Sequence, residues 1–347
     1  MTGTSARPTS AGADLNPSSG ALATLRDRLP AVSNPLRPLL LAAGRSAGLK
    51  RVVTGLPVTR TVVRRYVPGE GQDAVVAATR EILDSGRAIS IDHLGEDTSD
   101  PSQAEATVQA YLDLLADFGR LEVPPGLGVP ALEVSLKLSA LGQFLPQDGH
   151  DIALANARRI CAAADAVGAW VNVDAEDHTT TDSTLAIVRE LRVDHPSVAT
   201  VLQAYLRRTE DDCRALSGEG SRIRLCKGAY AEPADVAFQR SDEVDDSYRR
   251  CLAVLFAGEG YPMVASHDPA MISAAHDLAR EHGRTRDRYE FQMLFGIRDD
   301  EQRRLTAAGH TVRVYTPYGD EWYGYFMRRL AERPANLLFF ARSLVGR

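Results

Sequence analysis

The chain has 347 residues, 44% of them hydrophobic and 25% charged, which is the composition of an ordinary globular protein with a sizeable core. Its net charge of −6 and the lack of any block of basic residues exclude a typical nucleic-acid-binding protein. No apolar run approaches the ~20 residues of a membrane-spanning helix, and the four cysteines lack the C-x-x-C spacing of a zinc or disulfide framework.

The first 87 residues divide into two parts by composition. Residues 1–20 are rich in Ser, Thr, Gly and Pro, which predicts a disordered tail. Residues 21–87 predict N-terminal helices, and the clear examples are RPLLLAAGRSAGLK (37–50) and QDAVVAATREILDSG (72–86). The second stretch ends in Gly86, a residue type that suits the end of a helix.

From residue 88 onward, short apolar, β-branched runs alternate with amphipathic helical stretches. The runs are AISIDHL (88–94), ALEVSLKL (131–138), WVNVDAE (170–176), ATVLQAYL (199–206), RIRLCKG (222–228), PMVASH (262–267), YEFQMLFG (289–296) and HTVRVYTP (310–317). Strict alternation predicts parallel strands joined by helical crossovers, and eight such units fit a (β/α)8 barrel over residues 88–347. A doubly wound open sheet is the alternative, but no G-x-G-x-x-G motif follows an early strand.

A barrel of this kind carries its chemistry at the C-terminal ends of its strands. The polar residues that gather there are Asp92, His93, Lys137, Ser139, Asp174, Glu176, Asp177, Gln203, Tyr205, Arg224, Lys227, Tyr230, Ser266, His267, Glu290, Gln292, Tyr315 and Tyr318. Lysine usage is informative, because only three of the 40 basic residues are Lys. Two of them, Lys137 and Lys227, fall in apolar strand-like runs, so both are candidate site residues that need a compact or titratable charge.

The segment YGYFMRRLAER (323–333) follows the eighth run and predicts a C-terminal helix over the barrel mouth. One face of that helix carries Tyr325, Arg328, Arg329 and Glu332. A lone arginine pair is usually a solvated charged face, but a position beside the mouth favours a clamp that binds an anion. Because carboxylates and tyrosines accompany these cations, the mouth suits a small substrate that bears a carboxylate.

These residues leave the chemistry open between three hypotheses. In the first, Lys137 or Lys227 forms a Schiff base, as in aldolases or pyridoxal-phosphate barrels. In the second, the basic residues hold an anionic redox cofactor and the arginine pair holds the substrate. A non-catalytic binding module on the same fold is the third. The stretch DAEDH (174–178) lacks convincing metal-ligand spacing, so we expect no metal site.

Several segments favour the second hypothesis through a resemblance to a known family. They are SLKLSAL (135–141), VDAED (173–177), LQAYLRR (202–208), IRLCKGAY (223–230), EFQMLFG (290–296), YTPYG (315–319) and YFMRRLAE (325–332). In this order, and with Y-x-x-R-R-x-x-E as the most specific pattern, the chain resembles the proline dehydrogenases over about residues 88–345. Because these are flavin-dependent enzymes with a distorted (β/α)8 barrel, the resemblance implies that fold and FAD as the cofactor.

The resemblance also implies roles for individual residues. Those implied to hold the carboxylate of L-proline are Lys137, Arg328 and Arg329, and those implied to pack around its ring are Leu294, Tyr315 and Tyr325. Asp174 would organise the basic cluster by pairing with it. The residues implied to contact or line the FAD are Gln203, Arg224, Lys227, Gly228, Ala229, Tyr230, Ser266, His267 and Glu332, with Arg224 near the flavin N5.

The implied reaction is oxidation of L-proline to Δ1-pyrroline-5-carboxylate by hydride transfer to the flavin, the first step of proline catabolism to glutamate. Electrons would pass to a membrane quinone. A separate pyrroline-5-carboxylate dehydrogenase would take the product, because no aldehyde-dehydrogenase half follows and a monofunctional bacterial enzyme is expected. Hydroxyproline or another cyclic amine is the alternative substrate, and a Schiff-base lyase or aldolase the alternative enzyme.

The expected location is the cytoplasm. The apolar segment NLLFFARSLV (336–345) would pack against the barrel or make a peripheral contact with the inner face of the membrane.

Overall fold

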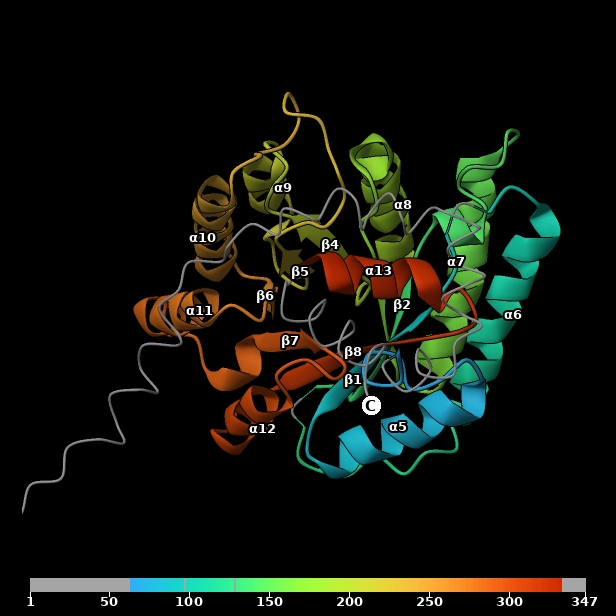
Figure 1. Ribbon diagram of the computed structural model, residues 1–347, viewed down its shortest axis with the longest axis horizontal. Helices are drawn as coiled ribbons and strands as arrows, with labels where there is room; N and C mark the ends of the chain where they lie inside the picture. Colours follow the sequence, from blue (N-terminus) through green and yellow to red (C-terminus); the bar gives the residue numbers. More distant parts are fainter. Residues whose placement is uncertain (1–62, 97, 128, 333–347) are drawn as a thin grey trace, which may run out of the picture.

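The computed structural model describes residues 63–96, 98–127 and 129–332, and Figure 1 shows strands surrounded by helices. The strands are β1 (Ala88–His93), β2 (Leu132–Leu136), β3 (Trp170–Val173), β4 (Ala199–Gln203), β5 (Arg222–Cys226), β6 (Tyr261–Ala265), β7 (Glu290–Leu294) and β8 (Val312–Tyr318). They form one closed barrel in sequence order, in which neighbouring strands are parallel and β8 pairs with β1. The predicted (β/α)8 barrel is therefore confirmed.

Helices follow the strands in alternation, as the sequence pattern predicts. They are α5 (Gln72–Asp84), α6 (Pro101–Phe118), α7 (Gly149–Ala166), α8 (Thr181–Asp194), α9 (Thr209–Leu216), α10 (Ser241–Ala257), α11 (Pro269–Glu281), α12 (Asp299–Ala307) and α13 (Trp322–Glu332). Gly86 adopts a φ of 76° directly after α5, a conformation that glycine reaches without strain. None of the helices in the described ranges is long and apolar enough to cross a membrane.

Some predictions fall outside the described residues. These are the tail at residues 1–20, the helix at 37–50 and the apolar segment at 336–345. The domain limits at residues 20 and 87 therefore stay predictions. Within the described ranges, seven of the eight predicted strands end too late, whereas β8 continues to Tyr318, one residue beyond its predicted end. For example, β3 stops at Val173 rather than at residue 176, because the polar residues that follow already belong to loops.

The apolar core is a shell between the strands and the helices. One buried cluster joins β1, β2 and β3 to α5, α6 and α7. A second joins β4 to β7 with α10 and α11. Burial of each large aliphatic side chain in such a shell stabilises the fold by roughly 1.5–3 kcal/mol. Alternate strand residues point the other way, into the barrel.

The barrel interior is polar, unlike the branched apolar layers that usually fill barrels. The buried side chains there include Ser90, Asp92, Glu133, Ser135, Lys137, Asn172, Asp174, Arg222, Arg224, Glu290, Gln292 and Arg313. Burying charged groups costs free energy unless they are paired and hydrogen-bonded. An interior of this composition is therefore a candidate for chemistry.

Helix α13 lies across the barrel in Figure 1, as predicted for the C-terminal helix. Its residues Trp322, Tyr325 and Phe326 are buried in a cluster with Tyr66 and Leu94. Leu94 follows β1 directly, so the helix covers the C-terminal ends of the strands. This contact brings the arginines of α13 to the polar interior.

Candidate active site

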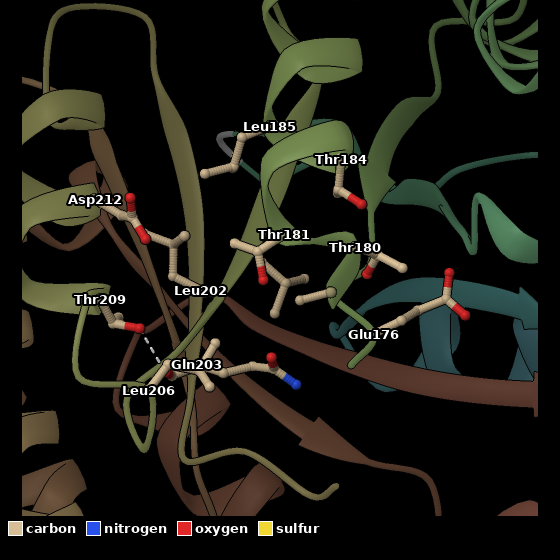
Figure 2. Close-up of a pocket in the computed structure, with 12 residues that line it drawn as sticks. Glu176, Thr180, Thr181, Thr184, Leu185, Leu202, Gln203, Leu206, Thr209 and Asp212 are labelled. Atoms are coloured by element: carbon tan, nitrogen blue, oxygen red, sulfur yellow. Dashed lines mark hydrogen bonds between the residues drawn. The ribbon is translucent and has the colours of Figure 1, made fainter. Parts of the chain in front are cut away.

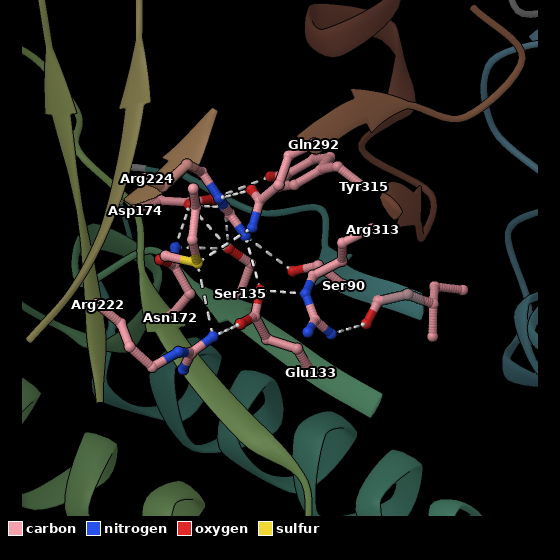
Figure 3. Close-up of polar contacts among 12 residues, drawn as sticks. Ser90, Glu133, Ser135, Asn172, Asp174, Arg222, Arg224, Gln292, Arg313 and Tyr315 are labelled. Carbon is pink, nitrogen blue, oxygen red and sulfur yellow. Dashed lines mark hydrogen bonds and ion pairs between the residues drawn. The ribbon is translucent and has the colours of Figure 1, made fainter. Parts of the chain in front are cut away.

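Three arginines and three carboxylates form a buried network inside the barrel, and Figure 3 shows how most of them converge. They are Arg222, Arg224, Arg313, Glu133, Asp174 and Glu290. Arg313 donates to both oxygens of Glu290 at 2.8 and 3.1 Å. Glu133 accepts from Arg222 at 2.5 Å and from Arg224 at 2.8 Å. The formal charges balance, which offsets the large desolvation cost of burying them.

Arg224 connects this network to the C-terminal ends of the strands, because it bonds to Asp174 directly after β3. Its guanidinium has five N–H donors, and each has an acceptor within the protein. The acceptors are Gln292 at 2.5 Å, Ser135 at 2.8 Å, Asp174 at 2.8 Å, Glu133 at 2.8 Å and Ser90 at 3.0 Å. The orientation of Arg224 is thus fixed. A contact from Arg224 to a flavin, as the resemblance implies, requires one of these acceptors to be released.

Lys137 lies at the end of β2 and pairs with Asp92 of β1. Its ammonium donates to Asp92 Oδ2 at 2.5 Å, and its side chain is only 8% exposed. Burial alone would lower the pKa of Lys137, but the carboxylates of Asp92 and Asp174 raise it above its usual value. The second oxygen of Asp92, Oδ1, is buried without a hydrogen-bond partner in the described structure.

Tyr315 and Asp174 link this pair to the arginine network. The hydroxyl of Tyr315 donates to Asp174 Oδ2 at 2.9 Å, and Asp174 Oδ1 accepts from Arg224. Burial, with Asp174 next in effect, raises the pKa of Tyr315 well above its usual value, so this hydroxyl is protonated. The structure therefore brings Lys137, Asp174, Arg224 and Tyr315 together, although their roles stay predictions.

Arg328 of α13 is bound by a carboxylate that the sequence analysis did not single out. Its two terminal nitrogens donate to the two oxygens of Glu96 at 2.6 and 3.2 Å. Burial would raise the pKa of Glu96, but the charges of Arg328 and then Lys137 lower it. Glu96 thus pairs with Arg328 and is subject to the charge of Lys137, and these are two of the three cations predicted to hold a substrate carboxylate.

The structure describes the side chains of only some of the other residues predicted to contact the substrate. Tyr325 is buried in the cluster beneath α13. The backbone N–H of Leu294, at the end of β7, donates to His267 Nε2 at 2.9 Å. Arg329 and Glu332 belong to α13, but their side chains lie outside those that the structure describes.

Most of the residues predicted to line a cofactor lie in the loops that follow β5 and β6. Lys227 donates to Asp268 at 2.7 Å and also pairs with Asp245 at 2.5 Å. Ser266 and His267 follow β6, and Gly228, Ala229 and Tyr230 follow β5. Gly228 has a φ of 108°, and a Cβ there would lie 2.2 Å from the ring of Tyr205. Only glycine allows this close approach of the backbone.

Gln203 and Glu176 line a small cavity between β4, α8 and α9 (Figure 2). The cavity measures about 10 Å³, close to the room that one water molecule needs. Glu176 accepts from the backbone N–H of Ser139 at 3.0 Å and from its hydroxyl at 2.5 Å. Burial raises the pKa of Glu176 to about 7.

We expect this carboxyl to make stability depend on pH. The folded pKa of about 7 exceeds the ordinary 4.5, so stability falls as pH rises from 4.5 to 7, by about 3 kcal/mol for this group. Glu176→Gln removes the titration and can still bond both groups of Ser139. Melting curves at pH 5 and pH 8 should show a smaller loss of Tm in this variant. Equal losses in both proteins would contradict the assignment.

Several residues of the site were not predicted from the sequence, among them Arg222 and Arg313. Asp92 was noted at a strand end but given no role, whereas Glu96 and Glu133 were not singled out. For Glu96, the signal was its position just beyond β1, on the rim where the other candidates lie. For Glu133, the signal was a carboxylate inside the apolar run of β2.

Comparison with known families agrees with the fold. The profile of the family described as "Proline dehydrogenase" matches residues 75–342, which include the barrel strands and α13. The chain belongs to the proline dehydrogenase family. Proline dehydrogenase of Deinococcus radiodurans is 38% identical over 288 residues, which are 82% of this chain and 90% of that protein. Proline dehydrogenase 2 of Bacillus subtilis strain 168 is 35% identical over 286 residues, 82% of this chain and 91% of that protein.

Larger members of the family share only part of their length with this chain. The bifunctional protein PutA of Escherichia coli K12 is 25% identical and matched over 26% of its length. The crystal structure of proline utilization A (PutA) from Bdellovibrio bacteriovorus, inactivated by N-propargylglycine, has a TM-score of 0.74 at 21% identity. The match covers 87% of this chain but 35% of that one, so the chain spans about a third of it. The matches to the two bacterial proline dehydrogenases, in contrast, extend over 90% and 91% of the length of those proteins.

Proposed function

We propose that this protein oxidises L-proline to Δ1-pyrroline-5-carboxylate with FAD as its cofactor. Membership of the proline dehydrogenase family implies a flavin-dependent enzyme, and FAD is the more specific part of the proposal. The observation that carries the substrate assignment is the ion pair of Arg328 with the internal carboxylate of Glu96 at the barrel mouth, where the charge of Lys137 also acts on Glu96. A mouth in which Arg328 already binds one carboxylate and Lys137 adds a second positive charge is suited to the carboxylate of an amino acid.

The substrate carboxylate would take the place of Glu96. The planar fork of Arg328 already bonds two carboxylate oxygens, so its geometry matches this ligand. Lys137 uses one of its three donors on Asp92, which leaves two donors for the substrate. Tyr315 and Leu294 would contact the ring, and α13 would exclude water from the site.

The residues at the ends of β4, β5 and β6 fit a flavin dinucleotide. Gly228 lets the backbone turn closely against Tyr205, and Lys227 supplies a cation for phosphate. Lys227 is already held by two carboxylates, so it would act as a fixed point charge. Gln203 and Arg224 would contact the flavin ring on its face toward the buried arginine network. When bound, the flavin supplies the two-electron oxidation of the carbon–nitrogen bond.

The buried pairing of Lys137 disfavours the Schiff-base alternative. A Schiff base requires a neutral amine, whereas the carboxylates around Lys137 raise its pKa and keep it protonated. In the proposed reaction Lys137 needs only its charge. The proline nitrogen, in contrast, must be neutral, because a protonated nitrogen cannot donate electrons to the forming imine.

We also propose where the electrons and the product go after the reaction. Electrons would pass to a membrane quinone, and a separate dehydrogenase would take the product. The protein would work in the cytoplasm or against the inner face of the membrane. Because Tyr315 would pack close to the ring carbon that bears the extra hydroxyl of hydroxyproline, proline is favoured over that substrate.

The test is the visible absorption spectrum of the purified protein, before and after L-proline is added without oxygen. We expect an oxidised-flavin spectrum that bleaches with proline. A flavin spectrum that does not change would contradict the substrate and point to another amine. A colourless protein that FAD does not reconstitute would overturn the proposal.

A further inference from the structure

Glu133 is buried deep in the barrel, yet it contacts the arginine that reaches the proposed flavin site. Its side chain is fully buried, and its two oxygens face different arginines. Oε2 accepts from Arg222 at 2.5 Å, and Oε1 accepts from Arg224 at 2.8 Å (Figure 3). The single negative charge of Glu133 therefore offsets part of the positive charge of both Arg222 and Arg224.

The charge of Glu133 is present throughout the physiological pH range. Burial would raise its pKa, but Arg313, Arg222 and Arg224 together lower it to about 2. The third arginine, Arg313, lies 3.9 Å from Glu133 and bonds chiefly to Glu290. Since the whole group is buried, water and salt screen these charges little.

We infer that Glu133 is a positioning residue that tunes the reduction potential of the flavin through Arg224. The inference rests on the proposed function, which places Arg224 beside the flavin. Reduction adds negative charge to the flavin, and a nearby arginine stabilises that charge. Glu133 offsets part of the positive charge of Arg224 and fixes its orientation, so it makes reduction harder than Arg224 alone would.

The sign of the effect follows from the charges. Glu133→Gln removes the negative charge and should raise the potential. Arg222→Gln removes a positive charge from the far side of Glu133, without touching Arg224, and should lower it. We expect at least a tenfold change in the ratio of reduced to oxidised flavin in each case, about 30 mV for a two-electron couple.

Two variants separate this charge effect from a merely structural one. Ser90 accepts from the same nitrogen of Arg224 as Glu133 does, at 3.0 Å, but carries no charge. Ser90→Ala should therefore leave the potential unchanged, although it removes a hydrogen bond. Glu133→Asp keeps the charge while it disturbs the geometry, and its potential should stay close to that of the wild type.

The experiment measures the midpoint potential of the FAD-loaded proteins by slow reduction with a dye of known potential, together with FAD affinity and Tm. Opposite shifts in Glu133→Gln and Arg222→Gln, with none in Ser90→Ala, would support the inference. If Glu133→Gln does not fold, Arg222→Gln carries the test alone. FAD-loaded variants with wild-type potentials would overturn the inference and leave the proposed function intact. A wild-type protein that binds no flavin would overturn both.

Discussion

Replacement of Arg328 by Met is expected to raise the KM for L-proline roughly 30- to 150-fold while FAD binding persists. The loss of a bidentate, partly buried contact to a carboxylate costs about 2–3 kcal/mol, which corresponds to that factor. The bonds to both oxygens of Glu96 show that Arg328 presents both terminal nitrogens to one carboxylate. Steady-state kinetics with proline, together with the flavin absorbance of the purified variant, would measure both effects.

Two control variants sharpen this prediction. Arg328→Lys keeps the charge but loses the fork, so its KM should lie between those of the wild type and Arg328→Met. Arg303 on α12 has a side chain that is 57% exposed and pairs with Asp299 on the surface. Arg303→Met should leave proline kinetics unchanged. An unaltered KM in Arg328→Met would remove this arginine from the substrate site.

The barrel could be predicted because its signals are local. Each strand is a short β-branched run, and each run is followed by polar residues and an amphipathic helix. The alternation predicts parallel strands joined by helices, and eight such units over this length favour a closed barrel, whose strands the structure places in chain order. The ends of the strands were less certain, because residues such as Asp174 and Ala175 continue the alternation of polar and apolar residues in sequence but already lie in the loop after β3.

The partners of the charged residues could not be predicted in the same way. Arg224 bonds to Glu133 and Ser90, which lie 91 and 134 residues earlier in the chain. No local pattern indicates such pairs, because they depend on which interior side chains meet across the barrel. The rarity of lysine did identify Lys137 as unusual, but not that Asp92 would be its partner.

The pairing of Arg328 with Glu96 could not be predicted from the sequence either. From the sequence, Arg328 was expected to bind the carboxylate of a substrate, whereas the structure pairs it with the carboxylate of Glu96 in the loop after β1. That loop precedes α13 by more than 200 residues, and only the barrel closure between β1 and β8 brings them together.

Replacement of Lys137 by Met is expected to affect both stability and substrate binding, and the two effects can be separated. Removal of the ammonium leaves Asp92, only 1% exposed, as an unpaired buried carboxylate. Breaking a buried pair in this way destabilises a protein by about 3–5 kcal/mol. Burial already raises the pKa of Asp92, and the lost charge of Lys137 would raise it further. The stability loss should therefore be largest at high pH and shrink as pH falls and Asp92 takes up a proton.

The double variant Lys137→Met/Asp92→Asn distinguishes the two roles of the lysine. It removes both charges, so most of the stability lost in Lys137→Met should return, because no unpaired buried charge remains. Proline binding should not return, because the substrate carboxylate still lacks one of its cations. Thermal melts and proline titrations of the flavin absorbance would measure the two quantities on the same samples. Proline affinity that recovers together with Tm would mean that Lys137 only maintains the fold, and that Arg328 and its neighbours bind the carboxylate without it.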